Sequence, residues 1–117
     1  MKRIFLALII ALSAIVAVSA ADKKEKEMPR VIDFNATWCG PCRTFKPVFE
    51  KVAKDYSKKA RFISVDVDKA PNMAQRYGVR SIPHIVVLDK KGNIVGQRSG
   101  AMTEEEFEAF IKESLKL

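Results

Sequence analysis

The sequence predicts an α/β fold in which one central sheet is covered by helices on both faces. Short apolar runs that suit strands alternate with segments whose apolar residues recur with the helical period. The resulting order is strand, helix, strand, helix, strand, strand, helix. Helical connections between the first three strands indicate right-handed crossovers in a parallel or mixed sheet, and a short turn joins the last two strands as a hairpin. The 117 residues suffice for one small domain.

The first half of this domain is predicted to contain a strand and a long helix. Residues 31–36 form an apolar run of strand length. A helix follows from Pro41, and Pro47 inside it predicts a kink. Its apolar residues share one helical face: Phe45, Val48, Phe49, Val52, Ala53 and Tyr56.

The second half is predicted to contain three strands and two helices. The strands are expected at 61–67, 85–88 and 94–98, and a short helix at 71–77, where a glycine follows and ends it. Thr103 begins the last helix, because the glutamate three residues later completes a capping box.

The N-terminal segment 1–20 has the three-part pattern of a secretory signal peptide. Two basic residues precede an apolar stretch, and small residues at 18–20 offer a cleavage site after Ala20. An uncleaved anchor is the alternative. The fifteen residues 4–18 reach about 22 Å as a helix, against about 30 Å for a hydrocarbon core. Either interpretation predicts export, to a bacterial periplasm, with a charged linker at 21–30 and the domain at 31–117.

The charge of the chain gives no sign of a nucleic-acid partner. The net charge is +7, from 21 basic and 14 acidic residues. The basic residues are spread along the chain and do not interleave with aromatic residues, which indicates a solvated surface. We therefore expect no nucleic-acid binding, and a monomer.

The two cysteines, Cys39 and Cys42, lie at the junction between the first strand and the long helix. An exported chain often has structural disulfides, but a bridge across so short a loop constrains the unfolded chain little. A zinc site needs about four ligands, and His84 is the only histidine that could add a third. The pair therefore predicts thiol–disulfide exchange, with no metal and no cofactor other than the cysteines themselves.

The position of each cysteine predicts its role. Cys39 lies where the helix begins, and there the unpaired N–H groups and the helix dipole stabilise a thiolate. Cys42 lies one turn further in, so we expect it to be more buried and to resolve the mixed disulfide. Gly40 permits a tight turn, Pro41 suits the first helical turn, and Trp38 offers a flat apolar surface.

Asp33 lies inside the apolar first strand, six residues before Cys39. Burial of a carboxylate is costly unless the group has a partner or a role. Its predicted role is to accept and donate a proton for Cys42, with a pKa raised by desolvation. The alternative is that its side chain faces solvent at the sheet edge.

Two strings of the sequence resemble the thioredoxin family closely. The first runs from Val31 to Arg43 and the second from Tyr77 to Pro83. Gly92 and Gly100 add a third match, and the resemblance extends from about Val31 to Leu117. It implies a thioredoxin-like fold, with a central mixed sheet of four strands, or five if another precedes Val31, and helices on both faces.

The resemblance also implies a substrate groove. Pro83 is expected to be cis and to lie beside the cysteines, and the backbone before it, at Ile82, to pair with substrate peptide. Gly100 is expected to border the same groove. Together with Trp38, Gly40 and Pro41, these are the predicted substrate-binding residues.

The sequence departs from the family pattern in four places. Few residues precede the first predicted strand, so the family's usual first strand and helix are expected to be missing and strand 61–67 to lie at an edge. Asn35 replaces a common aromatic residue. Ser64 stands where bacterial relatives often have lysine, so Asp33 is expected to titrate differently. His84 replaces the usual threonine after the proline, either to tune the thiolate or relay protons, or as a variable residue on a half-exposed strand.

The resemblance implies an exported thiol–disulfide oxidoreductase that reduces protein disulfides through Cys39 and Cys42. Gly40-Pro41 between the cysteines resembles reducing members of the family. The alternatives are a dithiol oxidase or isomerase, and a non-catalytic adaptor that holds a partner in the groove. The expected partners are disulfide-bonded substrate proteins and a membrane electron donor.

Overall fold

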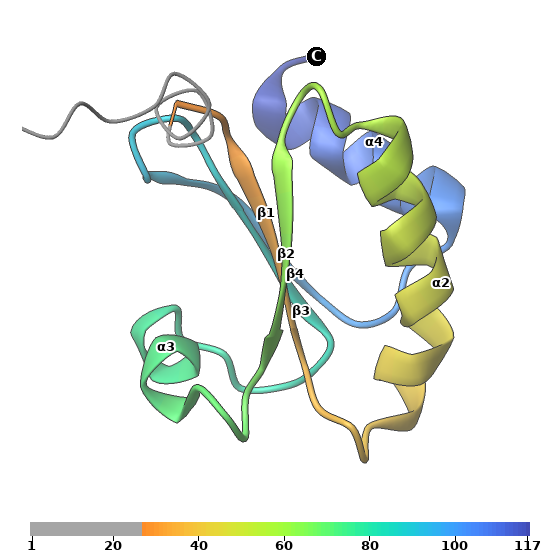
Figure 1. The fold of residues 1–117 in the computed structure, drawn as a ribbon, viewed down its shortest axis with the longest axis vertical. Helices are drawn as coiled ribbons and strands as arrows, with labels where there is room; N and C mark the ends of the chain where they lie inside the picture. The colour runs from red at the N-terminus through yellow and green to blue at the C-terminus, as the bar shows by residue number, and fades with distance from the viewer. Residues whose placement is uncertain (1–26) are drawn as a thin grey trace, which may run out of the picture.

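A computed structural model of the chain describes residues 27–117 (Figure 1). The signal peptide or anchor expected at 1–20, and the linker up to residue 26, lie outside the described residues. None of the helices within 27–117 has the length and the apolar composition of a membrane-spanning segment. The predicted linker boundary at residue 30 is wrong: Arg30 is the first residue of a strand, because it pairs with Arg61 and Leu88 in the sheet.

The described residues form one mixed sheet of four strands, as predicted. In chain order the strands are β1 (Arg30–Asn35), β2 (Arg61–Asp66), β3 (His84–Leu88) and β4 (Ile94–Ser99). Their spatial order is β2-β1-β3-β4, in which β2 is parallel to β1 and the other two pairs are antiparallel. Among these residues β2 is therefore an edge strand, which confirms the prediction for 61–67.

Helices cover both faces of the sheet (Figure 1). The long helices α2 (Gly40–Asp55) and α4 (Glu104–Leu115) lie on one face, and the short helix α3 (Pro71–Arg76) lies on the other. Each face has its own apolar core, because successive strand residues point to opposite sides. On β1, for example, Val31 packs in the core beneath α2 and α4, and Ile32 packs in the core beside α3.

The helix boundaries follow the local sequence signals. α2 runs without interruption through Pro47. The capping box at the start of α4 is present: Thr103 Oγ1 accepts a hydrogen bond from the Glu106 backbone N–H, and the Glu106 carboxylate accepts one from the Thr103 N–H, each at 3.1 Å. The sheet and its helices thus hold the start of α2 at the end of β1.

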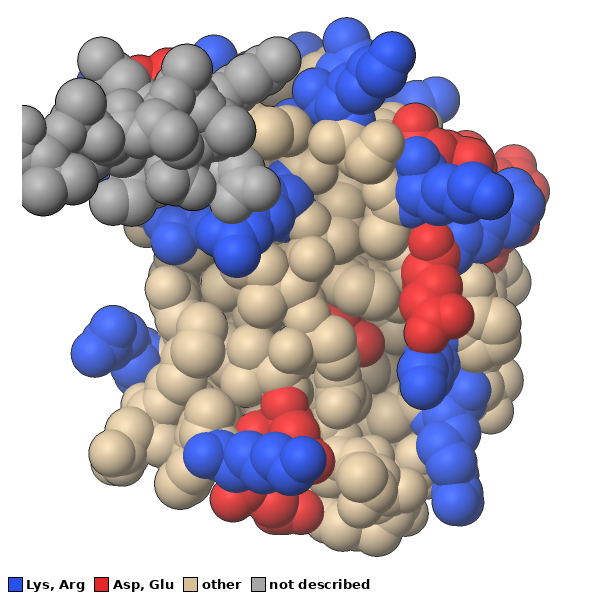
Figure 2. Space-filling view, viewed as in Figure 1, with Lys and Arg blue, Asp and Glu red and all other residues tan. Residues whose placement is uncertain are grey.

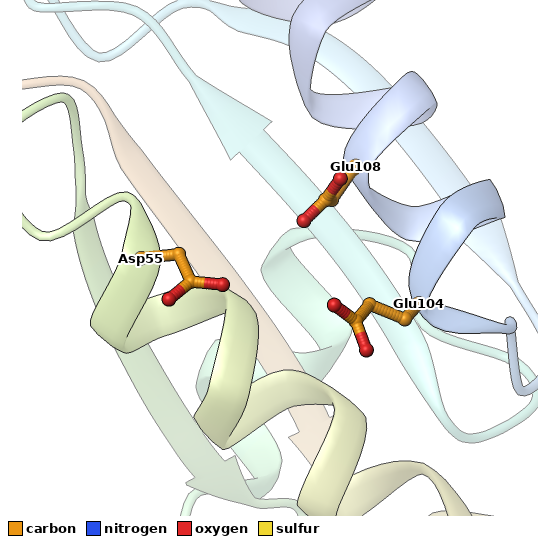
Figure 3. A group of neighbouring side chains, drawn as sticks. All are labelled: Asp55, Glu104 and Glu108. Carbon is orange, nitrogen blue, oxygen red and sulfur yellow. The ribbon is translucent and has the colours of Figure 1, made fainter.

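Three carboxylates meet on the exposed side of the α2–α4 contact. Asp55 from α2 points toward Glu104 and Glu108 from α4 (Figure 3), and their oxygen atoms lie within 4.8 Å of one another. Lys51 Nζ lies 3.4 Å from Asp55 Oδ2 and also bonds to Glu104. This lysine supplies positive charge to the cluster, which is accordingly an ion-pair link between the two helices.

Candidate active site

The strand-to-helix junction holds the two cysteines, which form a disulfide. Cys39 is the N-cap of α2, with extended backbone angles of φ −85° and ψ 113°, and Pro41 occupies the first turn. The Cys39 Sγ atom accepts a hydrogen bond from the Cys42 backbone N–H at 3.2 Å. The helix start therefore directs an N–H dipole at Cys39, an arrangement that stabilises a thiolate in the reduced protein.

The two cysteines are equally buried. Each is 5% exposed, so the expectation that Cys42 would be the more buried residue is wrong. The difference lies in what each contacts. Cys39 packs against the loop before β3, where its Sγ atom lies 3.8 Å from the carbonyl oxygen of Ile82. Cys42 instead lines a pocket between α2 and the sheet.

The loop before β3 brings the expected groove residues to Cys39. The Ile82–Pro83 peptide bond is cis, as the resemblance implied. The Gly100 N–H donates to the Pro83 carbonyl oxygen at 2.8 Å, so the end of β4 is held against the same loop. Gly100 has φ +99°, a conformation that favours glycine. Residues 82, 83 and 100, far apart in the sequence, thus lie together beside the disulfide.

Trp38 lies just before Cys39 and is 66% exposed. Its indole Nε1–H donates to Asp68 Oδ2 at 2.8 Å. Asp68 follows β2, so this bond holds one edge of the indole ring against the segment after that strand. The ring is therefore an exposed apolar surface beside the disulfide, as expected. Asp68 was missed from the sequence because nothing in its spacing marks it as a partner of residue 38.

Asp33 is buried on the α2 side of β1. The residue is only 3% exposed, so the alternative of a solvent-facing carboxylate is wrong. Its Oδ2 atom accepts a weak hydrogen bond from Asn35 Nδ2 at 3.4 Å, and Oδ1 has no hydrogen-bond partner within 27–117. Burial raises the pKa of Asp33 from its ordinary 3.8 to about 6, and the Asn35 amide partly opposes this rise.

A pocket of about 700 Å³ connects Asp33 with Cys42. Both residues line it, together with Phe49 of α2 and Phe62 of β2, and its mouth opens beside the edge strand. Figure 2 shows an acidic group recessed in a hollow of this face, with uncharged surface on one side and charged side chains along the other. Sequence reasoning predicted a functional pairing of Asp33 and Cys42, but not the pocket that both residues line.

A comparison of the sequence with models of known protein families identifies the family to which this arrangement belongs. The model of the thioredoxin family matches residues 17–113. The chain belongs to the thioredoxin family.

Two relatives illustrate how this chain of the thioredoxin family compares with other members in identity and length. It is 43% identical over 94 residues to a thioredoxin of Staphylococcus aureus strain Mu50, covering 79% of this chain and 89% of that protein. It is 37% identical over 92 residues to chloroplastic thioredoxin M4 of Arabidopsis thaliana, covering 76% of this chain and 48% of that protein. The chain thus spans about half the length of this chloroplast relative.

A solved structure shows the same fold. The germline-specific thioredoxin protein Deadhead of Drosophila melanogaster superimposes with a TM-score of 0.72 at 32% identity. The match covers 80% of this chain and 87% of that one. The thioredoxin-like fold predicted from the two strings is therefore confirmed.

Two of the departures from the thioredoxin pattern lie side by side in the pocket. Asn35 Nδ2 donates to Ser64 Oγ at 2.7 Å and to the Asp33 carbonyl oxygen at 3.1 Å. Asn35 ends β1 and Ser64 lies on the adjacent β2, where it is the register partner of Asp33. Two positions noted separately in the sequence therefore form one hydrogen-bonded unit.

His84 does not belong to that pocket. It is the register partner of Phe34 and so lies on the opposite face of the sheet from Asp33. The side chain is 8% exposed, so the expectation of a half-exposed residue is wrong. Its Nδ1 lies 2.7 Å from Ser99 Oγ and its Nε2 lies 2.9 Å from Gln97 Oε1, so both ring nitrogens are bound to β4.

Proposed function

We propose that this protein is a thiol–disulfide oxidoreductase that reduces disulfides of exported proteins with its own cysteine pair and no external cofactor. The observation that supports this most directly is the environment of Cys39. Its Sγ atom receives an N–H at the start of α2 and lies beside the Ile82 carbonyl oxygen and the exposed Trp38. Membership of the thioredoxin family supports the same conclusion.

The proposed reaction consists of two exchanges. In the dithiol form, the Cys39 thiolate attacks one sulfur of the substrate disulfide, which forms a mixed disulfide and releases one substrate thiolate. Cys42 then loses its proton and attacks Cys39 Sγ. The Cys39–Cys42 bond of the present structure forms, and the second substrate thiolate leaves and is protonated. The protein dithiol is oxidised and the substrate disulfide is reduced.

Asp33 serves the second exchange. A carboxylate whose pKa is raised to about 6 can take the proton of a thiol more effectively than an ordinary aspartate, because its basicity is closer to that of the thiolate. It shares the pocket with Cys42, in which water can connect the two groups. The proton then passes from Asp33 to the leaving substrate thiolate or to solvent.

The groove residues bind the substrate backbone in this proposal. A peptide beside Cys39 meets the backbone of Ile82 before Pro83 and the exposed Gly100 on one side, and the Trp38 ring on the other. Gly40 leaves free space, since a Cβ atom built there meets no atom within 4 Å. Gly40 and Pro41 thus keep the approach to the disulfide open for disulfide-bonded substrate proteins.

An assay of catalytic disulfide reduction distinguishes an enzyme from a non-catalytic adaptor. The reduced protein is expected to reduce insulin disulfides with dithiothreitol as the electron source, and Cys39→Ser to abolish this activity. Lys54→Ala, on the exposed end of α2, serves as a matched control and should retain it. If the protein were an adaptor, the wild type and Cys39→Ser would bind peptide equally well, and neither would reduce insulin.

The direction of electron flow rests on Gly40 and Pro41, which place no positive charge beside the Cys39 thiolate. We expect a reduction potential nearer the thioredoxin value of about −270 mV than the roughly −120 mV of a strong oxidant. Equilibration with glutathione buffers measures this. A potential above about −180 mV would favour the oxidase or isomerase alternative.

The proposal that the protein is exported rests on residues 1–20, which have the pattern of a signal peptide. In a bacterial host we expect the full chain in the periplasm, either cleaved after Ala20 or anchored by residues 4–20, and a chain that starts at Ala21 in the cytoplasm. N-terminal sequencing of the mature protein separates cleavage from anchoring. A reductant in an oxidising compartment requires a membrane electron donor, which is the second partner of this proposal.

A further inference from the structure

The hydrogen-bonded pair of Asn35 and Ser64 lies at the pocket through which Asp33 meets Cys42. Ser64 is an exposed residue on the edge strand β2, and Asn35 is half-buried at the end of β1. The 2.7 Å bond from Asn35 Nδ2 to Ser64 Oγ therefore spans the two strands at the pocket wall. Together with the bond to the Asp33 carbonyl oxygen, it fixes the orientation of the Asn35 amide.

The same amide also contacts the Asp33 carboxyl group. Asn35 Nδ2 lies 3.4 Å from Asp33 Oδ2 and 3.1 Å from the Asp33 carbonyl oxygen. The other carboxyl oxygen, Oδ1, is buried and has no partner in the part of the chain that the structure describes. The amide thus binds one carboxyl oxygen and leaves the other, buried oxygen without a partner among these residues.

We propose that Asn35 is a positioning residue, and that its amide, held by Ser64, orients the Asp33 carboxyl group so that Oδ1 exchanges the proton of Cys42 through the pocket. This inference rests on the proposed function. In the step that it serves, the Asp33 carboxylate takes the Cys42 thiol proton, and the Cys42 thiolate attacks Cys39 Sγ. The Cys39–Cys42 bond forms, the substrate thiolate leaves, and it then takes up a proton.

Few charged groups compete with Asn35 for Asp33. The charged residues that line the pocket are Arg43, Lys46 and Glu50, all exposed on α2. From β2 the lining residues are neutral, Phe62 and Ser64, and the register partner of Asp33 on β3 is Ile85. The neutral amide is therefore the one donor to the carboxyl group that the described residues provide.

Single-turnover kinetics with Ellman's reagent isolate the step that Asn35 serves. In excess reagent, the first release of nitrothiobenzoate reports the attack of Cys39 and depends on reagent concentration. The second release reports Cys42 attacking the mixed disulfide on Cys39, and its rate is independent of reagent concentration. In the wild type we expect this second rate to rise with pH, with a midpoint near the Asp33 pKa of about 6.

Three variants test the inference. Asn35→Ala removes the donor that stabilises the Asp33 carboxylate, so the midpoint should move up by about half to one pH unit. Asn35→Asp should move it at least as far, because a second carboxylate replaces the donor. Ser64→Ala frees the amide and should cause a smaller shift in the same direction. As the mildest change, it keeps the test valid if an Asn35 variant fails to fold.

Two controls separate positioning from a general structural effect. Asn93→Ala removes a similar amide–carboxylate bond, from Asn93 Nδ2 to Asp89 Oδ2 at 3.2 Å, in the turn between β3 and β4. It should leave the midpoint unchanged. In an Asp33→Asn background, Asn35→Ala should have no further effect on the pH profile.

The possible failures are distinguishable. A midpoint that stays at the wild-type value in Asn35→Ala and Ser64→Ala would refute the positioning role. A shift that persists in the Asp33→Asn background would do the same, because Asn35 would then act elsewhere. A wild-type protein that shows no reagent-independent second release would instead refute the proposed function.

Discussion

The Sγ atom of Cys39 lies 3.8 Å from the carbonyl oxygen of Ile82, which is 43 residues further along the chain. Cys39 comes from the start of α2 and Ile82 from the loop before β3, and β1 and β3 are adjacent in the sheet. A substrate backbone that approaches Ile82 is thereby brought to the sulfur of Cys39.

Cys42→Ser should trap substrate as a mixed disulfide, and Cys39→Ser should not. The reason is that Cys39 Sγ lies at the helix start and accepts a hydrogen bond from the Cys42 backbone N–H, which stabilises a thiolate on Cys39. Mass spectrometry after incubation with a disulfide-bonded peptide detects the adduct. Alkylation of the reduced protein at mildly acidic pH should label Cys39 first, and labelling of Cys42 first would reverse the assignment.

Trp38→Ala should reduce kcat/KM for protein disulfides several-fold and leave the melting temperature nearly unchanged, since the ring is 66% exposed. Asp68→Ala removes the acceptor of the indole N–H but retains the ring, so its effect should be smaller. Insulin reduction and thermal unfolding measure the two quantities. If Trp38→Ala lowered the melting temperature as much as it lowered activity, the ring would be a structural element instead.

Asp33→Asn should stabilise the protein at pH 7. The folded pKa of about 6 lies above the ordinary 3.8, so the native state binds more protons between these values. Wild-type stability should therefore fall as the pH rises from about 4 to about 6 and then level off. The pKa shift of roughly two units corresponds to a gain of about 3 kcal/mol in the free energy of unfolding of Asp33→Asn at pH 7. Below about pH 4 the titration of Asp33 should cause no difference between the variant and the wild type. Urea unfolding at several pH values measures this.

Asp89→Asn is the control for that experiment, because its expected effect on stability at pH 7 is opposite to that of Asp33→Asn. The backbone N–H of Asn93 donates to Asp89 Oδ1 at 2.9 Å and holds the pKa of this carboxyl group below its ordinary value. Its contribution to stability is present above the unfolded pKa and is lost as the pH falls through the folded one. Asp89→Asn should thus destabilise at pH 7. Equal effects of the two substitutions would contradict the role of burial at Asp33.

Gly96→Ala should destabilise the fold by about 1 to 3 kcal/mol through overpacking. A Cβ atom at this position of β4 would lie 2.2 Å from Ser114 Oγ and 3.2 Å from Phe110 Cζ, both on α4. Ser114→Ala removes the nearer atom and should restore part of the loss in the double variant. Chemical denaturation measures both effects, and a neutral Gly96→Ala would show that α4 moves away at little cost.

The sequence alone determined the local parts of the site. Helix-start signals placed Cys39 at the N-terminus of α2, and a capping box placed Thr103 before α4, because both depend on residues within one helical turn. The order of strands and helices predicted a mixed sheet with helices on both faces, since apolar periodicity is itself a local property. The thioredoxin resemblance implied the cis bond before Pro83, which composition and spacing did not indicate.

Only the tertiary structure decided which distant residues meet. The Asn35–Ser64 bond, the Trp38–Asp68 bond and the pocket between Asp33 and Cys42 depend on the register of β1 with β2 and on the packing of α2. Burial also depends on what covers a residue, which is why the equal burial of the two cysteines could not be predicted from their positions in the helix. Local patterns specify which elements form, whereas contacts across the sheet specify which chemistry those elements bring together.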